Sequence, residues 1–381
     1  MKFKLGDIVD VTMGQSPKSE FYNTEKKGYP FLQGNKTFGF KYPTFDIYTT
    51  FLTKSAKSGD IIMSVRAPVG DLNITPVDMC LGRGVCSLRM KNGNQNFLFY
   101  MMKYYIPHLQ KKENGTVFGS VNRNDITGLE VDIPEGIEVQ KKIARYLEMI
   151  DDKIQLNNMI NNNLEQQVLA LYQHNFIDTI NELRKNCKME EYFDVSIGKT
   201  PPRKEPRWFS NNLQDITWIS ISDMGNSGIY ISNSSEQLTK EAIEYHNIKI
   251  VPDNTVLLSF KLTVGRIAIT DGEATTNEAI AHFKTNQKEI NEYLYCYLKH
   301  FKFETMGSTS SIATAINSKI IKSMLFIVPT DIELDNFHNI VGPIFRKIKD
   351  NLIEISNLNY LRDTLLPKLL SGEIDVSEIN I

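Results

Sequence analysis

The sequence IARYLEMIDDKIQLNNMINNNLEQQVLAL, residues 143–171, decides the fold. Mostly apolar residues recur in it at alternating spacings of four and three residues, which is the a/d pattern of a coiled coil. We predict a long helix here, and its 29 residues at ~1.5 Å each would span ~43 Å, more than the ~34–36 Å of one turn of B-DNA. The seam positions are Ile143, Leu147, Ile150, Ile154, Asn157, Asn161, Leu164, Val168 and Leu171.

Residues 337–365 carry the same spacing. Each seam has an asparagine fourteen residues after its first member, Asn157 in the first and Asn351 in the second. A polar residue at a seam position costs stability but fixes the register. If the helices pair antiparallel, we expect Asn157 to face Asn351, and Arg362 indicates looser packing or a polar contact. The second seam comprises Phe337, Val341, Ile344, Ile348, Asn351, Ile355, Leu358, Arg362 and Leu365.

The chain repeats itself around these two stretches. The row KLGDIVDVTMGQSPKSE from Lys4 recurs as KMEEYFDVSIGKTPPRKE from Lys188. The row GDIIMSVRAPVGDLNIT recurs as NTVLLSFKLTVGRIAIT, and FLFYMMKYY recurs as YLYCYLKHF. Matching blocks in the same order are the signature of a repeat architecture. We therefore interpret the chain as a tandem duplication of about 190 residues.

Each copy is predicted to be a mixed domain followed by a long helix. Runs such as GDIIMSV and NTVLLSF are rich in strand formers and bounded by turn residues. Residues 97–105 and 293–301 carry apolar side chains at helical spacing. The predicted fold class is α+β, with two pseudo-symmetric mixed α/β domains joined by two long helices that form an antiparallel coiled coil. The mixed domains are placed at 1–136 and 184–331, and the helices at 137–183 and 332–381.

The composition is that of an ordinary globular protein. The chain has 381 residues, of which 41% are hydrophobic and 23% charged, so a disordered or fibrous chain is excluded. No apolar run reaches the ~20 residues of a membrane-spanning helix, and the start MKFKLGDIVD does not resemble a signal peptide. The four cysteines form no C-x-x-C pair. These features favour a reducing, cytoplasmic location.

The net charge of −2 conceals an alternating pattern. Lys and Arg outnumber Asp and Glu by 17 to 12 in residues 1–134 and equal them at 17 each in 184–331. Acidic residues outnumber basic ones by 8 to 4 in residues 135–183 and by 8 to 5 in 332–381. Because phosphate neutralisation supplies most non-specific affinity for nucleic acid, the net charge alone does not favour nucleic-acid binding.

The motifs of catalysis are missing from the sequence. The GKT at residues 198–200 lacks the first glycine of a P-loop, since that position is Phe193, and Pro201 follows where a helix would have to begin. No glycine-rich adenosylmethionine or dinucleotide loop is recognised. The six histidines are scattered, and no metal-ligand spacing or nucleophile–base constellation is seen. We predict no catalytic residue, no metal site and no cofactor in this chain.

Polar, turn-rich segments recur in both mixed domains and are the candidate DNA contacts. Their Gln and Asn side chains can pair with adenine, and their Arg and Lys side chains with guanine or phosphate. Their Ser and Thr hydroxyls suit phosphate oxygens. The candidates are Gln15, Lys18, Gln33, Asn35, Lys36, Arg66, Ser120, Asn122, Arg123, Lys199, Thr200, Arg203, Lys204, Arg207, Ser222, Lys261, Arg266, Ser310 and Asn317.

Taken together, the chain resembles the specificity subunit of a type I restriction–modification enzyme along its whole length. No single motif carries the resemblance, but their order, spacing and duplication are specific. The motifs are LGDIVDVTMGQSP, SGDIIMSVRAPVG, GSVNRNDITGLEVDIP and IEVQKKIARYLEMIDDKIQLNN in the first copy, and FDVSIGKTPP, SSIATAINSKIIKSMLFIVP and LRDTLLPKLLSGEI in the second.

This resemblance implies a function and partners. Each mixed domain would be a target-recognition domain that reads one half of a split, asymmetric double-stranded DNA sequence. The helices would set the gap between the half-sites and dock two modification (methyltransferase) subunits. Those partners would carry S-adenosylmethionine and methylate adenine. Separate restriction subunits would supply ATP- and Mg-dependent translocation and cleavage.

Two other functions stay open at this point. The chain could be an autonomous DNA methyltransferase or nuclease, which the missing motifs disfavour. It could also be a coiled-coil assembly scaffold without a DNA role. Activity of the purified chain with adenosylmethionine or magnesium would identify the first, and an unchanged methylated sequence after exchange of one mixed domain would identify the second.

Overall fold

The two long helices are shared between two compact units of the chain. The structure, a computed structural model, describes residues 1–110, 119–303 and 316–376. One unit comprises Met1–Leu156 together with the chain from Ser356 onward, and the other comprises Asn157–Ile355. Each unit therefore contains one mixed domain and one half of each long helix, whereas the boundaries predicted from the sequence follow the repeat.

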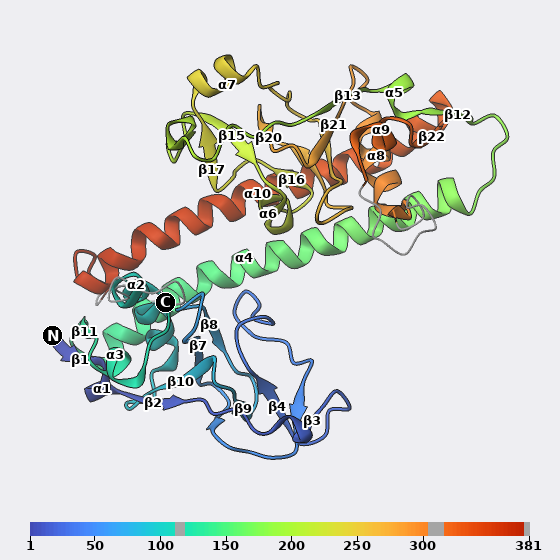
Figure 1. Cartoon of the computed structure of the whole chain (residues 1–381). Helices are drawn as coiled ribbons and strands as arrows, with labels where there is room; N and C mark the ends of the chain where they lie inside the picture. The colour runs from blue at the N-terminus through green and yellow to red at the C-terminus, as the bar shows by residue number, and fades with distance from the viewer. Residues whose placement is uncertain (111–118, 304–315, 377–381) are drawn as a thin grey trace. The chain divides into compact units, whose positions relative to one another are not determined.

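The first unit holds the first mixed domain (Figure 1). Helix α4 follows it over Ile137–Tyr172. The earlier elements are β1 (Lys2–Lys4), α1 (Leu5–Ile8), β2 (Val9–Met13), the 3-10 helix η1 (Ser19–Phe21), β3 (Tyr22–Asn23), β4 (Tyr29–Leu32), β5 (Tyr48–Thr49), β6 (Ser55–Ala56), β7 (Ile61–Ser64), β8 (Leu72–Ile74), β9 (Met79–Leu81), β10 (Val85–Met90), α2 (Gln95–Gln110), α3 (Arg123–Thr127) and β11 (Glu130–Asp132).

The second unit repeats this series. A π-helical turn, Gln173–Ile177, ends α4, and α10 runs over Asp331–Ser371. Between them lie β12 (Lys185–Lys188), α5 (Met189–Tyr192), β13 (Asp194–Ile197), the 3-10 helix η3 (Pro206–Trp208), β14 (Phe209–Ser210), β15 (Ile216–Ile219), α6 (Ile221–Asn226), β16 (Tyr230–Ile231), β17 (Glu236–Leu238), α7 (Lys240–His246), β18 (Val256–Ser259), β19 (Ile267–Thr270), β20 (Thr275–Thr276), β21 (Ile280–Lys284), α8 (Ile290–His300), α9 (Ser318–Lys322) and β22 (Leu325–Val328).

The strand pairing confirms the tandem duplication. The first domain has an antiparallel sheet in the order β2-β10-β7-β8, and the second has β13-β21-β18-β19 with β16 added at the edge. The short pair β1-β11 recurs as β12-β22. The parallel pair β4-β9 recurs as β15-β20. The same topology in both halves confirms the predicted α+β class with two equivalent mixed domains.

The central strand of each sheet is buried on both faces. In β7, Ile61 and Met63 belong to the cluster that α2 covers, whereas Ile62 joins a second cluster on the other face. In β18, Val256 and Leu258 face α8 and Leu257 faces the opposite way. Since side chains alternate along a strand, an uninterrupted apolar run is what a strand between two cores requires. Each sheet is thereby fixed between its helix and a second set of strands.

The two long helices run antiparallel where they meet. In the first unit Ile143 and Leu147 of α4 lie in one cluster with Leu366 near the end of α10. In the second unit Val168 near the end of α4 shares a cluster with Phe337 at the start of α10. Every predicted seam position is buried or half-buried. The predicted antiparallel coiled coil is confirmed within each unit.

The two seam asparagines do not pair as the sequence predicted. Asn157 donates to the Glu354 carboxylate at 2.8 Å, and Asn351 donates to the side-chain oxygen of Asn161 at 2.7 Å. Each asparagine thus meets a residue about one helical turn away from the other asparagine. The expectation that Asn157 faces Asn351 was wrong by that offset. Both still place a buried polar contact in the seam.

Arg362 makes the polar contact that its seam position suggested. Its guanidinium donates to the carboxylate of Asp151 at 2.9 Å, and that side chain is 1% exposed. The same carboxylate accepts bonds from the Tyr100 hydroxyl at 3.0 Å and from the Lys103 ammonium at 3.4 Å. Burial raises the pKa of the Tyr100 phenol, and the negative charge of Asp151 raises it further. Asp151 therefore joins α2, α4 and α10 in one buried polar node.

Removal of this carboxylate should destabilise the first unit strongly. Asp151→Ala removes the buried partner of Arg362 and leaves only the exposed Asp363 to pair with it, so we expect the free energy of unfolding to fall by ~3 kcal/mol. Urea unfolding followed by circular dichroism measures the change. Lys141→Ala is the matched control, because Lys141 pairs with Glu138 on the exposed face of the same helix and should cost at most ~1 kcal/mol. Equal losses in both variants would contradict the role of the node.

Candidate nucleic-acid interface

In the first mixed domain, backbone hydrogen bonds gather four loops at one end of the sheets. Gln15 N donates to Leu81 O at 2.9 Å, and Gly84 N donates to Gln33 O at 2.9 Å. Val65 N donates to Gly84 O at 2.9 Å, and Arg66 forms an isolated bridge with Ser120. Five exposed polar side chains line these loops, and we call them the first strip: Gln15, Gln33, Arg66, Arg83 and Ser120.

Glycines allow these loops to lie so close together. A Cβ on Gly84 would lie 2.3 Å from the carbonyl oxygen of Gln33, and one on Gly14 would lie 2.1 Å from that of Gly82. No side chain fits at such distances from backbone atoms. The G-x-G around Arg83 is therefore required by the close approach of the chain, and it presents that arginine at the tip of the loop between β9 and β10.

The second mixed domain contains the same meeting of loops. Lys199 N donates to Thr276 O at 2.9 Å, Asn277 N donates to Ile219 O at 3.1 Å, and Phe260 N donates to Ala279 O at 2.9 Å. The Lys199 and Phe260 bonds correspond to those of Gln15 and Val65, and the Asn277 bond corresponds to one from Gly82 N to Leu32 O at 2.8 Å in the first domain. We call the equivalent polar residues the second strip: Lys199, Ser220, Lys261 and Glu278. Two of them also have partners within the domain, since half-buried Ser220 is the N-cap of α6 and the Lys199 ammonium donates to His246 O at 2.6 Å.

The two strips share a backbone frame but differ in chemistry. The matched hydrogen bonds place Gln15 opposite Lys199 and Gln33 opposite Ser220 in the repeat. They also place Arg83 at the position of Glu278, which reverses the charge at the tip of the loop. Arg66 and Lys261 are both basic. The scaffold is thus repeated while the donor and acceptor pattern that it presents is not.

Glu278 is held as a hydrogen-bond acceptor. The Thr200 hydroxyl donates to its carboxylate, and this bond is the main reason why the pKa of Glu278 is lowered. The side chain remains exposed. An exposed, ionised carboxylate accepts hydrogen bonds but cannot donate them, and cytosine N4 is the matching donor in the major groove of DNA.

The sequence analysis missed Arg83, Ser220 and Glu278. The signal for Arg83 was its position between two glycines that interrupt an apolar run, in the row LGRGV. When that row is aligned with TNEAI in the second copy, Glu278 stands at the position of Arg83. Ser220 stands in the segment that was selected, where Ser222 was chosen instead. Of the residues that were named, the strips contain Gln15, Gln33, Arg66, Ser120, Lys199 and Lys261, with Thr200 beside Glu278.

Several other named residues have partners within their own domain. Asn122 and Asn317 are the N-caps of α3 and α9, where their side-chain oxygens accept backbone N–H bonds. Asn35 donates to the Asp71 carboxylate at 2.5 Å. Arg266 donates to the carbonyl oxygen of Ile221. These side chains shape the loops, and their predicted contacts with DNA stay predictions.

Two arginines of the second domain lie on aromatic rings. Arg203 stacks 4.2 Å from the Phe209 ring centroid, and both oxygens of Glu236 accept its hydrogen bonds. Arg207 lies 4.1 Å from the Trp208 centroid and pairs with its neighbour Glu205. The remaining candidates are exposed, except that Ser310 lies outside the described residues: Lys18, Lys36, Arg123, Lys204 and Ser222.

A buried histidine lies beneath the second strip. His282 is fully buried, with Nδ1 3.0 Å from Ser196 Oγ and Nε2 2.7 Å from Thr276 Oγ1. Burial, assisted by the charges of Lys284 and Lys249, lowers the pKa of His282 to about 3. The neutral ring thus links β13, β21 and β20, and Thr276 is the residue whose carbonyl receives Lys199 N.

This histidine predicts an acid-sensitive second unit. Because the folded pKa of His282 lies below the ordinary 6.5, its contribution is complete above pH 6.5 and is lost as the pH falls toward 3, by at most ~1.4 kcal/mol per pH unit. We expect His282→Asn to flatten the fall in unfolding free energy across this range. Urea titrations at several pH values measure it. His174→Asn, at an exposed histidine, should retain the wild-type slope, and an unchanged slope in His282→Asn would contradict the prediction.

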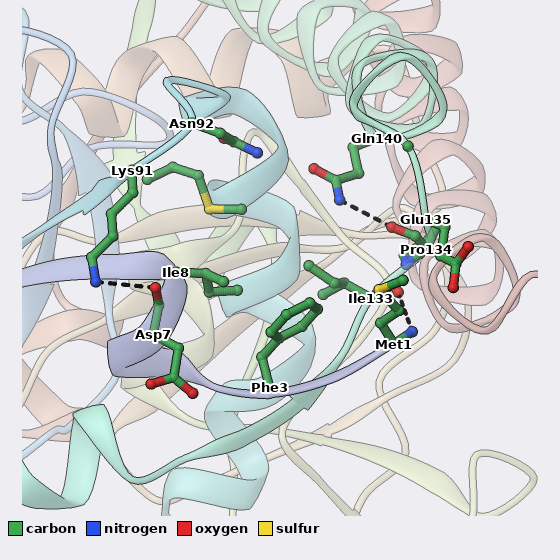
Figure 2. A pocket seen from close by; sticks show the side chains of 12 residues that line it. Met1, Phe3, Asp7, Ile8, Lys91, Asn92, Ile133, Pro134, Glu135 and Gln140 are labelled. Atoms are coloured by element: carbon green, nitrogen blue, oxygen red, sulfur yellow. Dashed lines mark hydrogen bonds between the residues drawn. The ribbon is translucent and has the colours of Figure 1, made fainter.

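The described residues contain no cluster of three or more His, Cys, Asp or Glu side chains that could hold a metal ion. A cavity of about 400 Å³ in the first unit is lined by β1, α1, the end of β10, the segment after β11 and the start of α4, with Phe3, Ile8 and Ile133 among its walls (Figure 2). It lies at the Val9 and Met90 end of β2 and β10, opposite the first strip.

No described helix has the length and apolar character needed to cross a membrane. The candidate functional surface is the pair of polar strips. Each is exposed, rigidly framed and rich in groups that match the edges of DNA bases.

Comparison with known sequences gives the class of the protein. The model of the type I restriction modification DNA specificity domain matches the chain twice, over residues 1–166 and 181–336. The chain belongs to this family and carries two copies of its domain. Specificity subunits recognise the DNA target of a restriction–modification system and are its non-catalytic components.

Individual relatives agree with this assignment. A specificity subunit assigned to the MjaX type I restriction enzyme of Methanocaldococcus jannaschii is 38% identical over 158 residues, which are 41% of this chain and 37% of that relative. The specificity subunit of the MjaIX enzyme from the same organism is 24% identical over 99% of this chain and 94% of its own length. The fold is similar to that of a crystallised type I S subunit from M. genitalium, with a TM-score of 0.54, 18% identity, and coverage of 99% of this chain and 96% of that one.

Proposed function

We propose that the chain recognises an asymmetric, bipartite sequence in double-stranded DNA. The first strip reads one half of the target and the second strip reads the other, each from the major groove. One observation carries the proposal: equivalent backbone bonds build both strips, while Gln15, Gln33 and Arg83 are replaced by Lys199, Ser220 and Glu278. Because each base pair shows a distinct donor and acceptor pattern in the major groove, different side chains on the same frame select different bases.

The long helices separate the two half-sites and dock the partners. In the first unit four apolar side chains of α4 and α10 are between 45% and 76% exposed: Met149, Leu156, Tyr360 and Leu361. Exposed apolar groups of this size on a helix pair favour contact with another protein. We assign this surface to one of two modification subunits, which bring S-adenosylmethionine and methylate adenine. Restriction subunits bring ATP and Mg for translocation and cleavage.

Methylation mapping tests the proposal directly. The chain is expressed with its modification subunits in a host that lacks other adenine methylation, and methylated adenines are mapped across the genome. We expect one motif of two different short blocks separated by a gap of constant length, lost when the chain is omitted. A contiguous motif, or methylation that persists without the chain, would overturn the proposal. Persistence would favour a scaffold role, and activity of the chain alone would favour a methyltransferase.

The two loop tips should act on separate half-sites. Arg83→Ala should relax a position in one block only, and Glu278→Gln should relax a position in the other block only. A loss of ~1–3 kcal/mol for the correct base is expected at each. Competition binding of the assembled complex to duplexes with single base changes measures both losses. Each variant is the control of the other, and an effect of both variants on the same block would contradict the assignment.

DNA affinity should depend on assembly. The chain has a net charge of −2, so phosphate contacts alone give it little non-specific affinity. We expect the isolated chain to bind its target weakly and the complex with the modification subunits to bind tightly. Fluorescence anisotropy at a fixed salt concentration compares the two. Equal dissociation constants would show that the chain needs no basic surface from its partners.

A further inference from the structure

Leu262 occupies a position that folding alone does not explain. Its side chain is 98% exposed, although it is a large aliphatic residue. Its backbone is left-handed, with φ of +60°, a conformation that residues other than glycine, asparagine and aspartate seldom adopt. Strained positions of this kind cluster at functional sites. Both the exposed side chain and the strained backbone therefore require a reason outside the domain core.

The loop that carries Leu262 is fixed by a serine at its base. Ser259 Oγ donates to the carbonyl oxygen of Thr263 at 2.6 Å and accepts from Arg266 N at 3.0 Å. Gly265 N donates to Ser259 O at 2.9 Å. These three bonds close the turn and hold Leu262 at its tip, so its exposure is built into the turn.

The first mixed domain contains the same turn with a different tip. Ser64 Oγ donates to Pro68 O at 2.7 Å and accepts from Asp71 N at 2.9 Å, and Gly70 N donates to Ser64 O at 3.0 Å. Counting from the two serines, Leu262 corresponds to Ala67. The turn forms without a large apolar residue at this position. The leucine is therefore a feature of the second mixed domain and not of the first.

The turn belongs to the second strip. Lys261 is a member of that strip, and the Phe260 N bond to Ala279 ties the turn to the loop of Glu278. Leu262 thus stands next to groups that are placed to contact DNA. In the major groove the thymine C5 methyl is the apolar group that a base presents. An exposed aliphatic side chain held at the tip of a rigid turn matches that group.

We propose that Leu262 is a specificity residue that contacts a thymine methyl group in the half-site read by the second mixed domain. The inference rests on the proposed function and deepens it. It predicts a thymine in that half-site at the position that Leu262 contacts. Ala67, at the corresponding position of the first domain, makes no equivalent contact.

Uracil substitution isolates the methyl group. Deoxyuridine keeps the O4 acceptor of thymidine and lacks only the C5 methyl. Each thymidine of the second half-site is replaced in turn, and binding of the assembled complex is measured by competition. For the wild type we expect one position where uracil weakens binding about fourfold, the scale of one buried methyl group. Leu262→Ala should bind the two duplexes equally and should bind the natural target about fourfold more weakly than the wild type.

Two further variants make the result decisive. Leu262→Gly removes the side chain and suits the left-handed backbone, so it should fold at least as well as the wild type and behave like Leu262→Ala. Leu213→Ala is the matched control, because Leu213 is 82% exposed in the same domain but precedes β15 at the end away from the strip. This control should keep the full discrimination against uracil.

The outcomes separate the two levels of the proposal. Sequence-specific binding with no sensitivity to uracil, or with the same sensitivity in the wild type and Leu262→Ala, would overturn the role of Leu262 alone. Absence of any sequence-specific binding by the wild-type complex would overturn the proposed function and this inference with it. Sensitivity at one thymine that both Leu262 variants lose would establish the contact.

Discussion

The core of the first unit depends on side chains from the far end of the chain. Leu366, Leu369 and Leu370 of α10 are buried against Ile143 and Leu147 of α4, together with residues of α2. An apolar helix face must be covered, and the last turns of α10 belong to the cluster in which α2 is buried. The antiparallel course of α10 is thus a condition for the first domain to be stable, and the buried node at Asp151 fixes which residues meet.

The sequence predicted the architecture because its signals were local and periodic. Alternating spacings of four and three residues identified both long helices, and the duplicated rows identified the two domains. The pairing partners of Asn157 and Asn351 were not predictable in this way. Antiparallel helices can slide by one turn while keeping an apolar seam, and the observed choice depends on Glu354, which is not a seam residue.

The candidate interface was predicted only in part, because it is assembled from distant segments. Gln15 and Arg83 become neighbours through backbone bonds between loops nearly seventy residues apart, and spacing along the chain does not reveal such contacts. The polar residues predicted to contact DNA also included Asn122, which caps α3. The row NRND carries the signature of a capping box, so this structural role was readable from the sequence. Arg83 and Glu278 emerge when the two copies are compared position by position within the frame of hydrogen bonds.

The second unit is one continuous stretch of chain, Asn157–Ile355, whereas the first is interrupted by it. During synthesis the ribosome therefore releases every segment of the second unit before the helix end that completes the first. Until then, the apolar surface of the first unit that packs against this helix end stays exposed. Exposed apolar surface in such intermediates promotes aggregation. Premature termination within the last turns of α10 would accordingly damage the domain made first, and leave the domain made later complete.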